Sequence, residues 1–314
     1  MTARDVVLLF PGQGSQKVGM GADLADADSR ACAVFESADA TLGIPLSRLC
    51  FEGPDEELMR TEHAQPALLT HGAAAWATVR DVLAPHVRAA AGHSLGEFTA
   101  YHAAGALSFS AALKVVRRRG ELMAMSGARR PGGMAAILGA NEDTVEAACR
   151  GASESGTVVP ANYNAPDQIV ISGEVEAVER AMVLAREGGA KRAIRLKVSG
   201  AFHSPLMAEA ADGLEEALEA ASFAPPAFPI YANVSAEPVT EPDAARRLLL
   251  EQLASPVQWT GTVRTLTVKY PDALFVELGP GVVLSNLVKR IATGTETAAC
   301  GTAADVEALL GRFS

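Results

Sequence analysis

Short apolar runs alternate with longer amphipathic stretches along the first part of the chain. Val6–Phe10 consists of five apolar residues stopped by Pro11 and Gly12, which is typical of a strand buried on both faces of a parallel sheet. A second run, residues 87–91, ends at Gly92 in the same way. Apolar residues at helical spacing predict helices around residues 28–41, 54–60, 64–83 and 110–126. Strand, turn and helix recur in this order, which predicts an α/β fold.

The pattern changes from about residue 130 onward. Apolar runs predict strands at residues 134–138, 158–161, 169–172 and 193–198, and helical spacing predicts helices at residues 141–149 and 175–187. The order β-α-β-β-α-β matches a ferredoxin-like split βαβ unit. We therefore expect residues 129–198 to form a small ferredoxin-like domain. It would be inserted into a larger α/β domain made of residues 1–128 and 199–314.

The larger domain then continues with further predicted elements. Ser204 and Pro205 begin a helix that extends to about residue 221. A last buried strand is expected at residues 275–278, directly before Gly279-Pro280-Gly281. The helical pattern that follows predicts a helix at about residues 283–291.

Composition places the chain among globular proteins and excludes several partners. It has 314 residues, of which 49% are hydrophobic and 20% charged, enough to fill a large core. At roughly 150 residues per domain, about two domains fit this length. The net charge of −10 argues against nucleic acid or an anionic membrane as the main partner, because both require an excess of Lys and Arg on one face.

Neither a membrane span nor a metal site is expected. No apolar run approaches the roughly 18 residues of a span. The run Val6–Phe10 is shorter than the roughly 7–15 residues of a signal-peptide core, so we expect a cytoplasmic protein. The cysteines match no zinc pattern, which indicates reduced thiols in the core; they are Cys32, Cys50, Cys149 and Cys300.

The segment Gly92-His93-Ser94-Leu95-Gly96 carries the first candidate chemistry. It lies between an apolar strand and a helical stretch, as the serine of a nucleophile elbow does. Ser94 would then lie at a helix N-terminus, where the Leu95 N–H can face a developing oxyanion. The alternative is a glycine-rich turn in which Ser94 only caps the helix.

A serine nucleophile needs a base, and His203 is the best placed of the six histidines. It follows a predicted strand and directly precedes the helix start at Ser204, the loop position where α/β enzymes present catalytic groups. His93 is adjacent to Ser94 on a tight turn, which favours a structural role. Three candidate acids fall in the small domain, namely Asp143, Asp167 and Glu174. A backbone carbonyl is therefore an alternative partner for His203.

Arg119 falls inside an apolar stripe of a predicted helix. This helix begins at Ser110 and stops at Gly127, and its stripe consists of Ala112, Val115, Val116, Leu122 and Met123. A guanidinium on a buried face requires an anionic partner. That partner is either an internal Asp or Glu, or a substrate carboxylate, to which Arg can donate two parallel hydrogen bonds.

Gly12-Gln13-Gly14 follows the first predicted strand, so a dinucleotide site has to be considered. The third glycine of that fingerprint would fall at position 17, which is Lys17, and the fingerprint fails. The loop could instead supply an oxyanion donor from the Gln13 backbone, in addition to the one from Leu95.

Together these residues resemble the malonyl-CoA:acyl-carrier-protein transacylases of fatty-acid synthesis and the related polyketide acyltransferases. The similarity covers nearly the whole chain, and its most specific segments are residues 10–16 (FPGQGSQ), 92–97 (GHSLGE), 161–166 (ANYNAP), 200–204 (GAFHS), 256–259 (PVQW) and 277–281 (ELGPG). The resemblance implies an α/β-hydrolase-like core with a parallel sheet, and a ferredoxin-like domain inserted into it.

The resemblance also implies catalytic roles by position. Ser94 is the acylated nucleophile and His203 is its base. The main-chain carbonyl of Gln252 orients the histidine, and the backbone N–H groups of Gln13 and Leu95 form the oxyanion hole.

Three further residues bind substrate in this family. Arg119 holds the malonyl carboxylate, Phe202 favours malonyl over methylmalonyl groups, and Asn162 lies near the pocket. For Gln252 and Asn162 taken alone, an ordinary structural hydrogen bond stays open as the alternative.

On this basis we expect malonyl transfer from malonyl-CoA to the phosphopantetheine thiol of acyl carrier protein. The reaction would be ping-pong and need no cofactor, the protein would be a monomer, and nucleic acid and membranes would not be partners. Carrier proteins are acidic, so basic residues have to gather near the site. Lys289 and Arg290 are the first candidates, and a second group comprises Lys191, Arg192, Arg195 and Lys197.

Three alternatives stay open. A free-standing acyltransferase of a polyketide synthase would use the same chemistry on another carrier protein. A thioester hydrolase would release free acid, which a buried Arg119 disfavours. A non-catalytic carrier-binding module is disfavoured because Ser94, His203 and Arg119 are all present.

Overall fold

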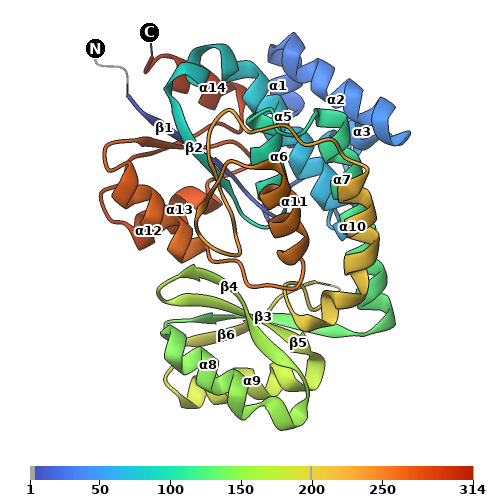
Figure 1. Cartoon of the computed structure of the whole chain (residues 1–314), viewed down its shortest axis with the longest axis vertical. Helices are drawn as coiled ribbons and strands as arrows, with labels where there is room; N and C mark the ends of the chain where they lie inside the picture. Colours follow the sequence, from blue (N-terminus) through green and yellow to red (C-terminus); the bar gives the residue numbers. More distant parts are fainter. Residues whose placement is uncertain (1–3, 199, 314) are drawn as a thin grey trace.

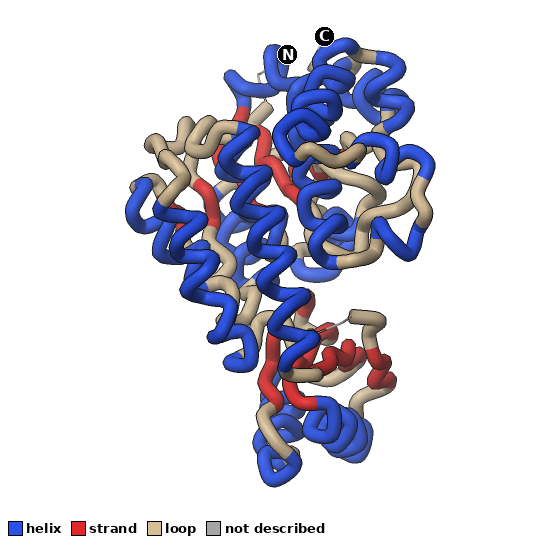
Figure 2. Tube along the Cα trace, turned by 90° about the vertical axis from the view of Figure 1, so that its right-hand side faces the viewer, coloured by secondary structure: helices blue, strands red, loops and turns tan. Residues whose placement is uncertain are grey.

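The computed structural model describes residues 4–198 and 200–313, which form two sheets with helices packed around them. Figures 1 and 2 place the larger sheet and most helices at one end of the molecule, and the smaller sheet with two helices at the other. The fold is therefore α/β, as the alternation of apolar runs predicts. One sheet is mixed and the other is antiparallel.

The larger sheet has the strand β1 (Val6–Phe10) near its centre. Among the described residues its order is β10-β9-β1-β2-β7-β8. β1 pairs in parallel with β2 (Val87–Gly92) on one side and with β9 (Leu274–Glu277) on the other. The outer strands are short: β7 (Ile230–Tyr231), β8 (Pro238–Val239) and β10 (Thr297–Ala299).

Helices cover both faces of this sheet because β1 is apolar at every position. Val6, Leu8 and Phe10 join the core beneath α5 (Thr61–Leu83), α6 (Leu95–Ala103) and α7 (Phe109–Arg129). Val7 and Leu9 join a second core beneath α12 (Trp259–Lys269) and α13 (Val283–Ile291). The other helices of this body are α1 (Ala22–Ala27), α2 (Ser29–Leu42), α3 (Leu46–Glu52), α4 (Asp55–Leu58), α10 (Ala211–Glu219), α11 (Pro242–Glu251) and α14 (Ala303–Leu310), with 3-10 turns at Ala84–His86 and Pro205–Ala210.

The smaller sheet consists of β3 (Gly132–Leu138), β4 (Val158–Ala165), β5 (Gln168–Glu174) and β6 (Arg192–Arg195). Its order is β4-β5-β3-β6, and every neighbouring pair is antiparallel. α8 (Glu142–Gly151) and α9 (Val175–Glu187) pack against it around a separate apolar core, with a 3-10 turn at Ser153–Ser155. The apolar pattern predicts all of these strands and both α-helices, with ends that differ by a few residues.

Backbone hydrogen bonds join the two parts of the molecule. The Tyr163 N–H of β4 donates to the Val257 carbonyl over 2.9 Å, and the Val257 N–H donates to the Ala161 carbonyl over 2.8 Å. The Thr260 hydroxyl at the start of α12 donates to the Tyr163 carbonyl over 2.9 Å. This contact places the end of β4 beside the loop before α12, so residues from both sheets can line one cavity.

The helix expected at residues 110–126 is longer than predicted at both ends. α7 begins at Phe109, because the Ser108 hydroxyl accepts a hydrogen bond from the Ala111 N–H over 3.2 Å. Gly127 does not stop the helix, which continues to Arg129. Gly127 is buried, and a Cβ built on Gly200 would lie 3.4 Å from its Cα. A glycine disfavours a helix by only roughly 1 kcal/mol, so it does not by itself end one.

Other expectations also need correction. The helix expected from Ser204 to about residue 221 is a 3-10 turn, Pro205–Ala210, followed by α10. The Ser204 hydroxyl accepts the Leu206 N–H at the start of the turn. β9 is the last fully buried strand, as predicted, and the partly buried strand β10 follows it with the sequence Thr-Ala-Ala. The predicted return to the larger domain at Ser199 lies outside the described residues.

Candidate active site

Ser94 lies in a sharp turn between β2 and α6. Its backbone has φ 51° and ψ −109°, a conformation that a non-glycine residue rarely adopts. Gly92 and Gly96 make the turn possible. A Cβ on Gly92 would lie 1.9 Å from the Gly96 carbonyl carbon, and a Cβ on Gly96 would lie 2.0 Å from the Phe10 carbonyl oxygen. Only glycine fits at either position, as expected where a strand turns sharply into a helix.

His203 reaches Ser94 from the chain that returns from the smaller sheet. Its Nε2 lies 2.8 Å from the Ser94 hydroxyl, and its Nδ1 lies 2.9 Å from the Gln252 main-chain carbonyl. Because a carbonyl only accepts, Nδ1 carries the proton and Nε2 is free to accept the serine proton. Burial, helped by the nearby Arg119 charge, lowers the pKa of His203 to about 3, so the ring is neutral at neutral pH.

Arg119 is 1% exposed and points from α7 into the same site. Its guanidinium donates to Gln65 Oε1 over 2.7 Å, to Gln252 Oε1 over 2.9 Å and to the Ser94 hydroxyl over 3.1 Å. In the described part of the chain, none of these partners is a carboxylate. Burial lowers the pKa of Arg119 to about 10, which still leaves the guanidinium charged at neutral pH.

The side chains of Asn233 and Gln252 hold the turn at Ser94 in place. Asn233 Oδ1 accepts the Ser94 N–H over 2.6 Å, and its Nδ2 donates to the Gly92 carbonyl over 2.6 Å. Gln252 Nε2 donates to the Ser94 carbonyl over 3.0 Å. Both residues are fully buried.

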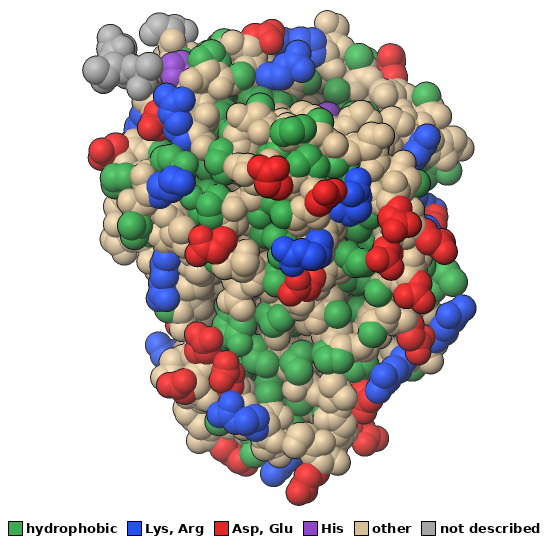
Figure 3. Space-filling view, in the orientation of Figure 1, with side chains coloured by type: hydrophobic (Ala, Val, Ile, Leu, Met, Phe, Trp, Pro, Cys, Tyr) green, Lys and Arg blue, Asp and Glu red, His purple; other side chains and the backbone are tan. Residues whose placement is uncertain are grey.

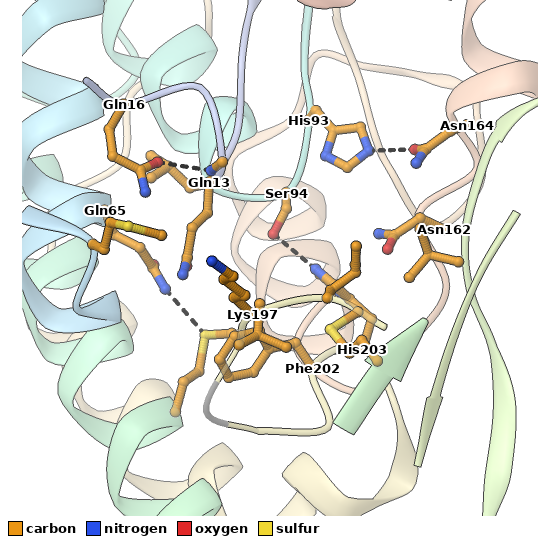
Figure 4. Close-up of a pocket in the computed structure, with 18 of the residues that line it drawn as sticks. Gln13, Gln16, Gln65, His93, Ser94, Asn162, Asn164, Lys197, Phe202 and His203 are labelled. Atoms are coloured by element: carbon orange, nitrogen blue, oxygen red, sulfur yellow. Dashed lines mark hydrogen bonds between the residues drawn. The ribbon is translucent and has the colours of Figure 1, made fainter. Parts of the chain in front are cut away.

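A cavity of about 370 Å³ opens at Ser94 (Figure 4). Gln13, Leu95, Asn162 and Phe202 line it together with Ser94, His203 and Arg119, so the structure brings these predicted site residues to one place. Its remaining wall is largely apolar, with Met123, Met134, Val170, Leu196 and Val198. Leu95 is the first residue of α6, so its N–H has no partner within the helix and faces this end of it.

His93 lies beside the site without contacting the Ser94 hydroxyl. Its Nε2 is 2.7 Å from Asn164 Oδ1, on β4 (Figure 4). The His93 ring lies 5.7 Å from the Trp259 ring. This agrees with the structural role expected for His93, because the contact with Asn164 links the turn at Ser94 to the smaller sheet.

Comparison with known proteins identifies the family. Residues 7–312 match the acyl transferase domain. The chain belongs to this family. It is 44% identical, over 304 residues, to the malonyl CoA-acyl carrier protein transacylase of Bacillus subtilis (strain 168), covering 96% of this chain and 95% of the relative. The family resemblance that the motifs indicate is thereby confirmed.

Solved structures of similar proteins extend over both sheets of this acyl transferase. An acyl-carrier-protein-S-malonyltransferase from Bartonella henselae matches with a TM-score of 0.94 and 38% identity, covering 98% of this chain and 99% of that one. A malonyl-transacylase in complex with a type II PKS acyl-carrier protein matches with a TM-score of 0.94 and 39% identity, also covering 98% and 99%.

The predicted basic residues of the acyl transferase lie in different surroundings. Lys197 lines the cavity, whereas Lys289 and Arg290 do not. Lys289 is exposed near the end of α13. Arg290 donates to Gln168 Oε1 over 2.6 Å and pairs with Asp167, so it links α13 to the smaller sheet.

The structure also shows site residues that the sequence analysis missed. Gln65 lies in a continuously buried stretch of α5, directly before Pro66, and its side chain accepts a hydrogen bond from Arg119. Asn233 follows a two-residue strand and cannot be recognised from a local pattern, because its partners are far away in the sequence. Within residues 4–198 and 200–313, no group of three or more His, Cys, Asp or Glu could hold a metal ion, and no helix is long and apolar enough to cross a membrane.

Proposed function

We propose that this acyl transferase moves a malonyl group from malonyl-CoA to the phosphopantetheine thiol of acyl carrier protein. One observation carries the proposal. Arg119 is a buried, charged guanidinium without a carboxylate partner, and it opens into the same cavity as the Ser94–His203 pair. An acyl group that brings its own carboxylate to this site supplies an anion in direct contact with the guanidinium, which none of its hydrogen-bond partners provides. The names of the relatives, as malonyl transacylases, support this choice of acyl group.

In the first half-reaction Ser94 becomes acylated. His203 Nε2 takes the hydroxyl proton while Ser94 Oγ attacks the thioester carbonyl of malonyl-CoA. The oxyanion faces the N–H groups of Leu95 and Gln13, both at the cavity wall. The carbon–sulfur bond then breaks, coenzyme A leaves with the proton from His203, and a malonyl-serine ester remains.

The second half-reaction reverses these steps with another thiol. His203 takes the proton of the carrier-protein thiol, whose sulfur attacks the ester carbonyl. The ester bond breaks, Ser94 recovers its proton from His203, and malonyl carrier protein leaves. The Gln252 carbonyl stabilises the imidazolium in both halves, because it accepts the Nδ1 proton over 2.9 Å.

Substrate selection is assigned to Arg119, Phe202 and Asn162. The Arg119 guanidinium lies 3.1 Å from the Ser94 hydroxyl, within reach of an acyl group attached there. Phe202 is 5% exposed and lines the cavity, where its ring would crowd an α-methyl branch. One methyl group in a pocket changes the binding free energy by about 1–3 kcal/mol.

We also propose that the domains follow the family pattern. Residues 129–198 would be a ferredoxin-like domain inserted into an α/β-hydrolase-like domain of residues 1–128 and 199–314. The order β4-β5-β3-β6 with two helices on one face supports the first assignment, and the strand-turn-helix at Ser94 supports the second. Three further predictions remain: the enzyme needs no cofactor, it is a monomer and it is cytoplasmic.

Lys289 remains our candidate for carrier-protein docking. It is exposed on α13, and the Arg290 next to it is partly neutralised by Asp167. The face seen in Figure 3 carries acidic and basic side chains side by side, so an acidic carrier protein requires a local cluster rather than a general positive surface.

The proposal is tested by mixing the enzyme with malonyl-CoA and acyl carrier protein that bears phosphopantetheine. We expect malonyl carrier protein to accumulate, as read by intact-protein mass spectrometry, with little free malonate. Release of malonate faster than transfer would indicate a thioester hydrolase instead. A panel containing a fatty-acid and a polyketide carrier protein distinguishes the two pathways. Fatty-acid synthesis is the pathway we propose, and the polyketide carrier is the alternative because one relative is bound to a type II PKS carrier protein.

A further inference from the structure

Glu97 is a buried carboxylate that the proposed mechanism leaves without a task. It lies in the first turn of α6, close behind Ser94, and is 0% exposed. Burial of an unpaired carboxylate is unfavourable, so its surroundings indicate why it is there. Burial also raises the pKa of Glu97 to about 7, opposed by hydrogen bonds from Asn233 and Gln252 and by the charge of Arg119.

The contacts of Glu97 lead to both residues that hold the turn at Ser94. Its Oε2 accepts a hydrogen bond from Gln252 Nε2 over 2.7 Å and from the Asn233 N–H over 3.0 Å. Asn233 in turn accepts the Ser94 N–H, and Gln252 donates to the Ser94 carbonyl. One carboxylate oxygen therefore holds the Gln252 side chain and the Asn233 backbone, and these two residues contact the backbone at the nucleophile.

The same carboxylate is connected to Arg119 through an amide. Gln252 donates from Nε2 to Glu97 and accepts at Oε1 from Arg119 Nη2 over 2.9 Å. An amide between an anion and a cation is polarised in the sense that strengthens both hydrogen bonds. Arg119 only donates and Glu97 only accepts, so the two contacts favour the same orientation of the Gln252 amide, and loss of the carboxylate removes one of them.

We infer that Glu97 is a positioning residue for malonyl transfer: it orients the Gln252 amide so that its oxygen faces Arg119, and thereby aims the guanidinium into the cavity. Glu97 does not touch the acyl group and acts through Gln252 and Asn233. The inference rests on the proposed function, because its effect is on the residue assigned to the malonyl carboxylate.

The alternative is that Glu97 only stabilises the fold. Glu277 provides a matched control for this alternative, since it is also 0% exposed and accepts two backbone hydrogen bonds, from Leu284 over 2.9 Å and from Ser285 over 2.7 Å. Those partners lie at the start of α13 and belong to no contact with Ser94, His203 or Arg119. Glu277→Gln therefore reports the structural effect of removing a buried negative charge elsewhere.

The test compares Glu97→Gln, Glu97→Asp and Glu277→Gln with the unchanged enzyme. The rates of acylation of Ser94 by malonyl-CoA and by acetyl-CoA are measured by quenched-flow mass spectrometry, and the melting temperature of each protein is recorded. In Glu97→Gln the amide oxygen can still accept both hydrogen bonds but the negative charge is lost, so we expect kcat/KM for malonyl-CoA to fall about tenfold, the difference between a charged and a neutral hydrogen bond. The rate with acetyl-CoA should fall less, so the malonyl-to-acetyl preference decreases.

Glu97→Asp keeps the negative charge on a side chain that is shorter by one methylene. Its malonyl-to-acetyl preference should lie between those of the unchanged enzyme and Glu97→Gln. It supplies the same comparison if Glu97→Gln does not fold. Glu277→Gln should lower the melting temperature and leave the malonyl-to-acetyl preference unchanged. The inference is overturned if the Glu97 variants also change only the melting temperature. The proposed function fails separately, if the unchanged enzyme does not take up malonyl at all.

Discussion

Burial lowers the pKa of both His203 and Arg119, but it leaves the two side chains in different charge states at neutral pH. The pKa falls to about 3 for the imidazole and to about 10 for the guanidinium. At neutral pH the imidazole is therefore neutral and able to accept a proton, while the guanidinium keeps its charge. One buried site thus holds a ready base and a permanent cation, both within hydrogen-bond distance of the Ser94 hydroxyl.

Arg119 is the residue that should decide between malonyl and acetyl groups. In Arg119→Ala we expect kcat/KM for malonyl-CoA to fall about 10- to 100-fold, because a charged hydrogen bond contributes about 1.5–3 kcal/mol. The rate with acetyl-CoA should change much less. Steady-state kinetics with both thioesters measures this ratio.

Arg117→Ala is the matched control, since Arg117 lies on the same helix but pairs with Glu121 and donates to the Glu62 carbonyl outside the cavity. An unchanged malonyl-to-acetyl ratio in Arg119→Ala would remove the carboxylate-binding role.

The roles of some site residues can be predicted from the sequence, whereas those of others cannot. Arg119 is conspicuous because a charge interrupts an apolar stripe, and its burial follows from that pattern. The hydrogen bond between His203 and the Gln252 carbonyl cannot be predicted from spacing, since 49 residues separate them and a carbonyl has no residue signature. Asn233 is hidden for the same reason, because its role depends on where β7 ends in space.

At the scale of elements, the turn between β2 and α6 depends on two glycines that have no room for a side chain. A Cβ at Gly96 would lie 2.0 Å from the Phe10 carbonyl oxygen in the neighbouring strand β1. The elbow and the central strand are therefore packed backbone against backbone, and neither can shift without the other.

We predict that Gly96→Ala destabilises the protein by at least about 3 kcal/mol, the upper end for overpacking, because backbone atoms cannot move aside as a flexible side chain could. Chemical unfolding followed by circular dichroism measures the change. Gly311→Ala is the control, since its nearest atom to an added Cβ is 3.5 Å away and its φ is −60°. Similar stability changes for the two variants would show that the elbow is not tightly packed.

His71 couples α5 to the chain before α14 and should make stability depend on pH. Its Nε2 lies 3.1 Å from the Gly301 carbonyl, and burial lowers its pKa from 6.5 to about 4. As the pH falls below 6.5 the unfolded chain takes up a proton that the folded chain does not. The stability that His71 contributes at neutral pH is therefore lost progressively between about pH 6.5 and pH 4.

In His71→Gln, whose amide can still donate to Gly301, this loss should disappear. Urea unfolding measures the free energy of unfolding of each protein at pH 7 and at pH 5. Between these two pH values the free energy should decrease by about 2 kcal/mol less in His71→Gln than in the unchanged protein. An equal decrease in both proteins would mean that His71 does not titrate in this way.

Long elements with strong apolar spacing were predictable, whereas short ones were not. The bounds of β1, α9 and α13 agree with the apolar pattern, because each carries a complete run or a full amphipathic stretch. The two-residue strands β7 and β8 and the edge strand β10 form only through pairing with distant strands. α7 ends three residues beyond the predicted end, because glycine disfavours a helix by only about 1 kcal/mol and Gly127 does not stop it.

At the scale of the whole molecule, the net charge of −10 imposes a requirement on docking. An acidic enzyme and an acidic carrier protein repel each other at long range, and salt screens this repulsion. Any docking surface must therefore be a local group of basic residues whose charge is not neutralised by acidic neighbours.

Lys289→Glu should raise the KM for carrier protein about two- to fivefold, the effect of an exposed ion pair of up to about 1 kcal/mol, without changing the rate of Ser94 malonylation. Arg290 is less suitable, because its charge reversal would also oppose Asp167. Lys114→Glu, exposed on α7 and in no ion pair among the described residues, changes the net charge equally and is the control. If both variants change the KM alike, docking depends on total charge and not on α13.

The central claim is that Ser94 carries the malonyl group, and the mass of the enzyme after exposure to malonyl-CoA alone tests it most directly. We predict one added malonyl group in the unchanged enzyme, located on the peptide that contains Ser94, and its disappearance when carrier protein is added. Ser94→Ala should gain no mass. A malonyl adduct on Ser94→Ala, or on a peptide without Ser94, would contradict the account.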